Sequence, residues 1–284
     1  MLHAVLFAEL IHAVELLRNG DLVALPTETV YGLGADAANE TAVAKIFAAK
    51  GRPADHPLIV HVAKNVKLET WAIEIPKIAN KLTEAFWPGP LTLILKKSVR
   101  IPKAVTGGQD TVGLRCPAHP LAQQLLMEFA KVGSGIIAAP SANKFGHISP
   151  TTAKHVFAEF GDGLLILDGG PCEVGIESTI LDLSRMRSLK HPVLLRPGAI
   201  TAEMIAHVIG ETPLHADDVP TSRSRPASAD TPRVSGSLAA HYAPKTPLRL
   251  LKAKQIQDEA NQQLAAGERV AVLAFSQPHG AAPS

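Results

Sequence analysis

The sequence is poor in cysteine, has no long apolar run and carries little net charge. Its two cysteines, Cys116 and Cys172, fit neither a metal site nor a disulfide framework, which favours a reducing compartment. No apolar stretch is long enough to cross a membrane, and the N-terminus lacks the cationic segment and cleavage site of a signal peptide. These absences predict a cytoplasmic protein without membrane contact.

The composition is that of a globular protein. The formal net charge of +2 is too small to indicate nucleic-acid binding by itself, although it leaves a local basic cleft open. With 284 residues, 46% of them hydrophobic and 19% charged, the chain has material for one large core and a smaller second unit. We find no internal repeat, no catalytic triad, no paired carboxylates in a motif and no cluster of His and Cys with metal-ligand spacing.

The segment 25–61 carries most of the chemical groups that suggest a site. The apolar run 22–25 predicts a buried strand, which Pro26 ends because proline has no N–H for the ladder. Hydroxyls and a carboxylate follow in 27–31, and Gly32 and Gly34 then let the backbone turn closely. Such a strand end suits a small polar ligand.

A helix is predicted to begin near residue 40 and to end before Gly51. Asn39 is a suitable N-cap, and Gly51 is a common residue at a helix C-terminus. Lys50 therefore lies at the last turn, where its charge either complements the helix dipole or takes part in a site. The residue alone does not decide between these two interpretations.

Four cationic or near-cationic groups surround the strand predicted at 58–62. Lys50 and Arg52 leave the helix end side by side, and His56 and His61 flank the strand. Together with the neighbouring hydroxyls, they predict a site for an anion.

The remainder of the large domain alternates between helical and extended patterns. Helices are predicted at 7–19, 75–86, 119–130, near 152 and at 201–209, and strands at 91–97, 111–117, 135–139, 164–167, 177–183 and 193–195. Periodicity is lost from 211 to about 236, where Pro, Ser, Thr, Arg and Asp predict a linker. The tail then predicts a strand at 247–251, a helix at 254–266 and a strand at 269–275. The predicted division is 1–210 for the large domain, 211–246 for the linker and 247–284 for a partial α/β unit.

Three motifs closely resemble the YrdC-like domain of threonylcarbamoyl-AMP synthases. They are PTETVYGLG at 26–34, KGRPADHPLIVH at 50–61 and Ser-Ala-Asn at 141–143. The His-Tyr pair at 241–242 resembles the linker of the longer, two-domain members. The resemblance implies an α/β fold, a twisted mixed open sheet with flanking helices, followed by an abbreviated C-terminal unit.

The resemblance also implies a reaction. L-threonine, bicarbonate or carbon dioxide, and ATP would give threonylcarbamoyl-AMP and pyrophosphate, a nucleotidyl transfer with Mg²⁺ on the triphosphate and no organic cofactor. Downstream tRNA threonylcarbamoyl transferase machinery would use the product to modify an adenosine of tRNA. Direct contact between this chain and tRNA is left open.

The family's site residues can be carried onto this sequence one by one. The predicted catalytic residues are Lys50 and Arg52. The predicted ATP-binding residues are Arg52, His56, Thr111, Ser141, Asn143, Ser149, Arg196 and Tyr242. The predicted threonine-binding residues are Thr29, His61, Arg115, Ala139 and Ser178, and no metal ligand is assigned.

Several alternatives remain on sequence alone. Arg115 is either a solvated residue at a strand end or a fork of donors for a carboxylate, and Ser178 is either an ordinary strand hydroxyl or a ligand contact. Tyr242 either anchors the linker on an apolar patch or belongs to a lid. A non-catalytic module of the same fold that binds tRNA or double-stranded RNA is the alternative function. It would need Lys50 and Arg52 but not the threonine pocket.

Overall fold

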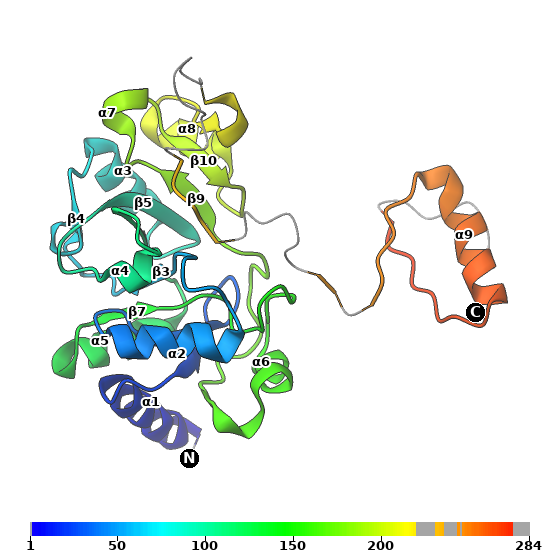
Figure 1. The fold of residues 1–284 in the computed structure, drawn as a ribbon, viewed down its shortest axis with the longest axis horizontal. Helices are drawn as coiled ribbons and strands as arrows, with labels where there is room; N and C mark the ends of the chain where they lie inside the picture. The colour runs from blue at the N-terminus through cyan, green and yellow to red at the C-terminus, as the bar shows by residue number, and fades with distance from the viewer. Residues whose placement is uncertain (1, 220–230, 236–242, 245, 275–284) are drawn as a thin grey trace. The chain divides into compact units, whose positions relative to one another are not determined.

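The computed structural model of the chain describes residues 2–219, 231–235, 243–244 and 246–274 (Figure 1). Contacts between residues divide the chain into two compact units, Met1–Ala243 and Pro244–Ser284. The boundaries predicted from composition lie elsewhere, at 210 and 246, and remain a prediction. Within the described ranges, no helix is both long and apolar enough to cross a membrane.

The first unit alternates between helices and strands, as the sequence predicts. Its helices are α1 (Leu2–Arg18), α2 (Glu40–Lys50), α3 (Lys77–Phe86), α4 (Lys103–Thr106), α5 (Pro120–Val132), α6 (Ala153–Phe160), α7 (Met186–Leu189) and α8 (Ala202–Ile209), with short 3₁₀ turns at Leu68–Thr70, Gly161–Gly163 and Ala216–Asp218. Its strands are β1 (Val23–Leu25), β2 (Gly32–Asp36), β3 (Ile59–Val62), β4 (Ala72–Ile73), β5 (Leu91–Lys97), β6 (Thr111–Arg115), β7 (Ile136–Ala138), β8 (Leu165–Ile166), β9 (Thr179–Asp182), β10 (Val193–Arg196) and β11 (Leu214–His215).

In the part of the chain that the structure describes, the strands form one eleven-stranded mixed sheet. Its order is β11-β10-β9-β5-β6-β3-β7-β2-β1-β8, with β4 paired to β5 outside this path. β3 runs parallel to β6 but antiparallel to β7, and β5 runs parallel to β9 but antiparallel to β6. The strands at the two ends of this order, β11 and β8, are not paired with each other, so the sheet is open. This confirms the predicted fold class, an α/β protein with a mixed open sheet and flanking helices.

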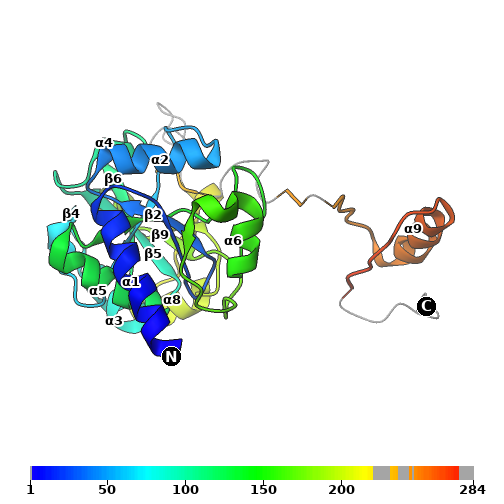
Figure 2. The same ribbon diagram turned by 90° about the horizontal axis from the view of Figure 1, so that it is seen from below.

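The two faces of the sheet bury different sets of side chains. Val23 and Leu25 of β1 pack with α1 and α5, whereas Ala24 between them packs with the core that includes α2 and α3. This alternation follows from the two-residue period of a strand. α1 and α5 lie against each other in Figure 2 and contact each other directly. Phe129 of α5 is fully buried there, and burying such a ring stabilises the fold by about 1.5–3 kcal/mol.

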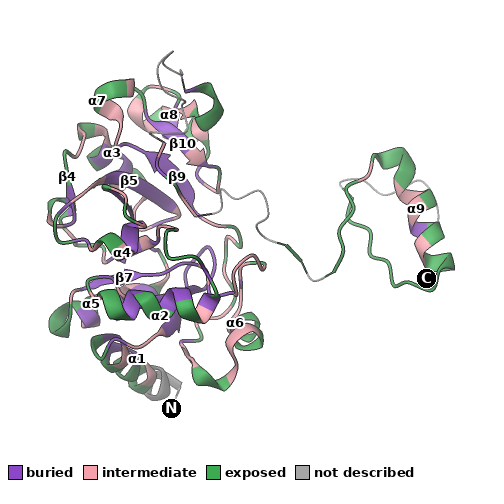
Figure 3. Ribbon diagram, in the orientation of Figure 1, coloured by how far each residue is buried: buried purple, intermediate pink, exposed green. Residues whose placement is uncertain are grey.

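α2 begins and ends where the sequence predicts. The side chain of Asn39 accepts hydrogen bonds from the N–H groups of Thr41 and Ala42, and Gly51 ends the helix with φ at 64°. A positive φ is the conformation that glycine adopts without steric cost. The buried residues of α2 lie on one stripe (Figure 3), and Lys50 is its last residue. The helix end therefore fixes where Lys50 and Arg52 leave the backbone.

Gly32 and Gly34 lie in strand β2 and not in a turn, so the close turn predicted at these residues was wrong. At Gly34 it is packing that requires a glycine. β1 ends at Leu25, directly before Pro26, and β2 returns antiparallel to it. A Cβ on Gly34 would lie 2.8 Å from Cδ2 of Leu25 and 2.9 Å from Cγ2 of Ile137, which is closer than real Cβ atoms come. No larger residue fits at this position of β2 without movement of its neighbours.

The second unit contains the predicted helix but not the predicted strands. α9 (Ala253–Ala265) corresponds to the helix expected at 254–266. Within the described residues 246–274, the strands expected at 247–251 and 269–275 are not formed, so that prediction was wrong. A strand needs a ladder partner and a face to bury, and Leu250 and Leu273 in these segments are almost fully exposed.

Candidate active site

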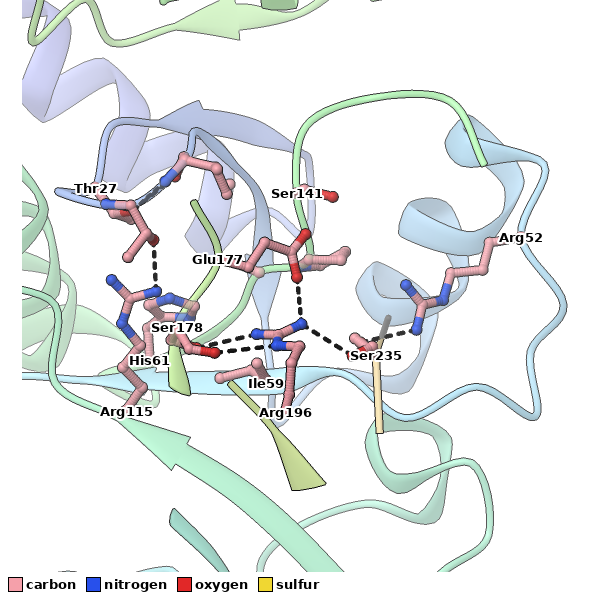
Figure 4. A pocket seen from close by; sticks show the side chains of 15 residues that line it. Thr27, Arg52, Ile59, His61, Arg115, Ser141, Glu177, Ser178, Arg196 and Ser235 are labelled. Carbon is pink, nitrogen blue, oxygen red and sulfur yellow. Dashed lines mark hydrogen bonds and ion pairs between the residues drawn. The ribbon is translucent and has the colours of Figure 1, made fainter. Parts of the chain in front are cut away.

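A pocket that encloses about 480 Å³, part of it open to solvent, lies where the loops after β1, α2 and β7 meet the ends of β6 and β10 (Figure 4). We refer to it as the cavity. Side chains from segments far apart in sequence form its wall: Thr27, Thr29, Val30, Gly32, Arg52, Ile59, His61, Arg115, Ala139, Pro140, Ser141, Glu177, Ser178, Arg196 and Ser235. Residues predicted from the sequence to bind either ligand therefore share one cavity: Thr29, Arg52, His61, Arg115, Ala139, Ser141, Ser178 and Arg196.

Arg115 forms one end of the cavity. It ends β6, is only 4% exposed, and donates from Nη1 to the hydroxyl of Thr29 at 2.8 Å. Its Nη2 lies 2.6 Å from Oε1 of Glu28. The interpretation of Arg115 as a solvated strand-end residue is therefore wrong. A buried, oriented guanidinium suits a planar carboxylate.

Arg52 forms the opposite end of the cavity, as Figure 4 shows. It is 7% exposed, and its Nη2 donates to the carbonyl of Pro57 and to the hydroxyl of Ser235, each at 3.0 Å. Arg196 lies between the two ends in the same view. The cavity thus has guanidinium groups along its length, which is the charge pattern of a site for an elongated anion.

Lys50 stands behind the cavity wall. Its ammonium group donates to the carbonyl oxygen of Ser141 at 2.5 Å and to that of Asn143. Burial, reinforced by the nearby charge of Arg52, lowers the pKa of Lys50 to about 7. The amine of Lys50 is therefore about half protonated at neutral pH. Lys50 itself does not line the cavity, so its catalytic role remains a prediction.

Arg196 is held by several acceptors at once. Its Nε and Nη2 donate to the carbonyl and hydroxyl of Ser178 at 3.0 and 3.1 Å, and its Nη1 donates to the carbonyl of Ser235 at 2.9 Å. Nη1 also pairs with Glu177, whose other oxygen accepts the hydroxyl of Ser149 at 2.9 Å. Ser149 therefore reaches the cavity through Glu177. Ser178 is 1% exposed, and its hydroxyl accepts a hydrogen bond from Arg196. It therefore belongs to the hydrogen-bond network of the site.

The two predicted histidines differ in environment. His61 on β3 is buried at the cavity wall, and its burial, with the charge of Arg115, lowers its pKa to about 3. It is therefore neutral at physiological pH. His56 lies outside the cavity wall, with its ring edge-on to Phe145 at 5.6 Å between centroids. Partial burial and the charge of Arg52 lower the pKa of His56.

A second, more apolar cavity of about 300 Å³ adjoins the first. Thr111 lines it, and Ile59 and Ser235 belong to both cavities. Its other wall residues are Pro57, Leu58, Ile94, Gln109, Gly113, Ile180, Arg233 and Val234. Thr111 is thus separated from Arg115, which lies on the same strand but lines the first cavity.

The remaining predicted residues lie beside the cavity or outside the described residues. Asn143 is buried, and its amide donates to the carbonyls of Lys144 at 2.7 Å and His147 at 2.9 Å, so it shapes the loop that accepts Lys50. Tyr242 lies outside the described residues. Its neighbour Ala243 is described and donates its N–H to the carbonyl of Gly146 at 2.9 Å.

The sequence predicts no binding role for seven residues of the cavity wall: Thr27, Val30, Gly32, Ile59, Pro140, Glu177 and Ser235. Two of them, Glu177 and Ser235, contact arginines of the site, and so does Glu28 behind the wall. Each makes its contact across more than 18 positions of sequence, with Arg115, Arg196 or Arg52. A signal was present for Glu28 and Glu177, because a buried arginine needs an anionic partner. Ser235 had no such signal.

The fold and the cavity define an α/β protein with a buried, arginine-lined site for small anionic ligands. Residues 15–198 match the Sua5/YciO/YrdC family model, described as telomere recombination. Residues 200–282 match a model described as the C-terminal domain of threonylcarbamoyl-AMP synthase. The chain therefore belongs to the Sua5/YciO/YrdC family and to its two-domain form.

Individual relatives agree with this assignment. The chain is 49% identical over 233 residues to the threonylcarbamoyl-AMP synthase of Pyrococcus abyssi, covering 82% of this chain and 64% of that protein. It is 44% identical over 278 residues to the threonylcarbamoyl-AMP synthase of Bacillus subtilis, covering 96% of this chain and 75% of that one. The chain thus spans about two thirds to three quarters of the length of these relatives.

Solved structures show the same fold. The crystal structure of P. abyssi Sua5 complexed with L-threonine superposes with a TM-score of 0.79 at 42% identity, covering 95% of this chain and 78% of that one. Escherichia coli YciO superposes with a TM-score of 0.57 at 23% identity, covering 69% and 92%, and at that identity it supports the fold alone.

Proposed function

We propose that this chain is an L-threonylcarbamoyladenylate synthase, a nucleotidyltransferase that makes threonylcarbamoyl-AMP and pyrophosphate from L-threonine, bicarbonate or carbon dioxide, and ATP. The observation that carries the proposal is that Arg115 and Arg52 line opposite ends of one cavity. One end suits a carboxylate and the other a triphosphate. The names of the P. abyssi and B. subtilis relatives, and the L-threonine in the P. abyssi complex, support the choice of substrates.

The amino acid would occupy the Arg115 end. Its carboxylate would meet the guanidinium, with the hydroxyls of Thr29 and Ser178 and the neutral ring of His61 around it. Ala139 on the same wall leaves room for the substrate because its side chain is a single methyl group. A neutral imidazole can accept or donate a hydrogen bond there without adding charge.

The nucleotide would occupy the other end. Arg52 and Arg196 would bind the phosphates, with Lys50 adding charge from behind the Ser141 loop. Ser149 and Asn143 would shape this end through Glu177 and the loop carbonyls. The second cavity, with Thr111 on its wall and apolar side chains around it, would receive the base, and His56 would lie near the entrance.

The chemistry is a two-step transfer. The amine of threonine attacks carbon dioxide and loses a proton, which gives a carbamate. A carbamate oxygen then attacks the α-phosphorus of ATP, and the bond from that phosphorus to the bridging oxygen of pyrophosphate breaks. Arg52, Arg196 and Lys50 would stabilise the negative charge that spreads over the phosphate oxygens. A buried site would also exclude the water that destroys both the carbamate and the mixed anhydride.

A magnesium ion would accompany the triphosphate. Among the described residues, no three His, Cys, Asp or Glu side chains converge on a common point. That is compatible with Mg²⁺, which is commonly bound by substrate phosphates and water with one or two carboxylates. Of the described residues that line the cavity, Glu177 alone carries a carboxylate, so it would be the protein's contribution. The ion would neutralise charge on the phosphates.

The product would be passed to the machinery that transfers threonylcarbamoyl groups to tRNA. The test of the proposal is pyrophosphate release, with L-threonine, bicarbonate and ATP omitted one at a time. We expect release only when all three are present, together with a product of the mass of threonylcarbamoyl-AMP. Pyrophosphate released equally without threonine would contradict the proposal, and tight tRNA binding without any release would favour the binding module instead.

A further inference from the structure

Glu28 lies directly behind the wall of the cavity, between two residues that line it. Its side chain is buried, at 6% exposure, and both of its oxygens are engaged. Oε1 lies 2.6 Å from Nη2 of Arg115, and Oε2 accepts the N–H of Ala118 at 3.0 Å. Its own carbonyl accepts the N–H of Val174 at 2.8 Å. Glu28 is therefore fixed at three points.

All three guanidinium nitrogens of Arg115 have a neighbour that holds them. Nη2 faces Glu28, Nη1 donates to Thr29 at 2.8 Å, and Nε lies 3.4 Å from the carbonyl of Gly89. A guanidinium has five N–H groups in a rigid plane. These contacts fix the plane, and with it the direction in which the N–H groups that they do not use point.

The charge of Arg115 also needs a partner when no substrate is present. Arg115 is 4% exposed, and leaving a buried charge without a counter-charge is strongly unfavourable. Glu28 is the carboxylate beside it, so Arg115 has an ion-pair partner that does not depend on the substrate.

We propose that Glu28 is a positioning residue for the amino-acid substrate: by holding the guanidinium of Arg115 in one orientation, it sets the affinity for the substrate's carboxylate. The inference rests on the proposed function. Glu28 does not line the cavity and acts through Arg115, so it affects the amino-acid end and leaves the end formed by Arg52 unchanged.

The test is the substitution Glu28→Gln, which keeps the shape of the side chain and removes its charge. We expect the KM for L-threonine to rise about tenfold or more, while the KM for ATP changes by less than about threefold. If Glu28 only stabilised the fold, its substitution would change the KM for L-threonine and the KM for ATP by similar factors. Adding Arg115→Lys should reveal coupling, so that the double variant loses less threonine affinity than the sum of the single losses.

A matched control is available in a second buried ion pair. Asp182 contacts Arg185 at 2.6 Å and accepts the N–H of Ser184 at 2.8 Å, the same kinds of partner that Glu28 has, but it does not line the cavity. Asp182→Asn should lower the melting temperature without raising the KM for L-threonine. If Glu28→Gln fails to fold, Glu28→Asp is the second variant, because it keeps the charge on a shorter side chain. It must still raise the KM for L-threonine and leave the KM for ATP unchanged.

Two failures are distinguishable. A wild-type protein that releases no pyrophosphate with all three substrates would overturn the proposed function. An active wild-type protein whose Glu28 variants raise both KM values equally, or neither, would overturn the positioning role alone.

Discussion

The ammonium group of Lys50 lies 2.5 Å from the carbonyl oxygen of Ser141, a residue 91 positions further along the chain. This contact joins the end of α2 to the loop after β7, and both segments border the cavity that Arg52 and Ser141 line. Two motifs that are distant in sequence therefore form one site. The contact also buries an amine whose pKa is lowered to about 7, mainly by desolvation.

The first prediction concerns proton uptake on nucleotide binding. At pH 8 the amine of Lys50 is mostly neutral in the free protein, because its pKa is about 7. The negative charge of a triphosphate at Arg52 favours the protonated amine and raises this pKa. Calorimetric titration with a non-hydrolysable ATP analogue at pH 8, in buffers of different ionisation enthalpy, should show net proton uptake. Uptake of the same size in Lys50→Met would contradict the assignment.

The second prediction concerns stability in acid. The pKa of His61 is lowered from 6.5 to about 3 in the folded protein, so the unfolded chain binds more protons between these values. Stability must therefore rise with pH across that window and fall as the solution is acidified. His61→Gln should flatten the dependence of the unfolding free energy on pH between about 4 and 6.5.

The exposed residue His12 provides the control for this prediction. Because its side chain is 59% exposed, His12→Gln should change the free energy of unfolding at neutral pH by less than about 0.5 kcal/mol, which shows that a His→Gln change is tolerated by itself. An equal slope in wild type and His61→Gln would show that His61 does not carry the effect.

The third prediction concerns Gly34 in strand β2, which pairs with β1. A Cβ at Gly34 would press on Leu25 and Ile137 in the core, whereas a Cβ at Gly163 would meet nothing within 4 Å. Gly34→Ala should lower the free energy of unfolding by about 1–3 kcal/mol. Gly163→Ala is the matched control and should change it by less than about 0.5 kcal/mol. Urea denaturation of both variants checks this, and equal effects would be inconsistent with the packing described.

The fourth prediction concerns Tyr31, a buried residue of the first motif. Its hydroxyl donates to the carbonyl of Gly170 at 2.7 Å and accepts the N–H of Gly169 at 3.2 Å, which ties the motif to the turn after β8. Burial raises the pKa of Tyr31 to about 12, so the phenol stays neutral. Tyr31→Phe should cost about 1–3 kcal/mol of stability, because it leaves both backbone groups unpaired. A melting temperature equal to that of the wild type would argue against this link.

Local chemistry made much of the fold predictable. The cap at Asn39, the stop at Gly51 and the end of β1 before Pro26 depend on neighbouring residues, and each is confirmed. The tail strands failed because a strand depends on partners that its own sequence does not reveal.

The site was predictable where a motif carried it and not where the fold alone created it. Arg52 and Ser141 follow from motifs, and the structure brings both to the cavity. The contacts of Glu177 with Arg196, and of Ser235 with Arg52, join segments whose proximity depends on the whole sheet. No local pattern says which arginine such a residue will meet, so these two contacts follow from the structure alone.

The central claim is that one cavity holds the amino acid at Arg115 and the triphosphate at Arg52. Its most direct test is the KM of each substrate for pyrophosphate release in Arg115→Met and Arg52→Met. The account predicts that Arg115→Met raises the KM for L-threonine more than that for ATP, and that Arg52→Met does the reverse. Two results would contradict the single shared cavity. In one, each variant raises the KM for L-threonine and the KM for ATP equally; in the other, Arg115→Met mainly affects ATP and Arg52→Met mainly affects L-threonine.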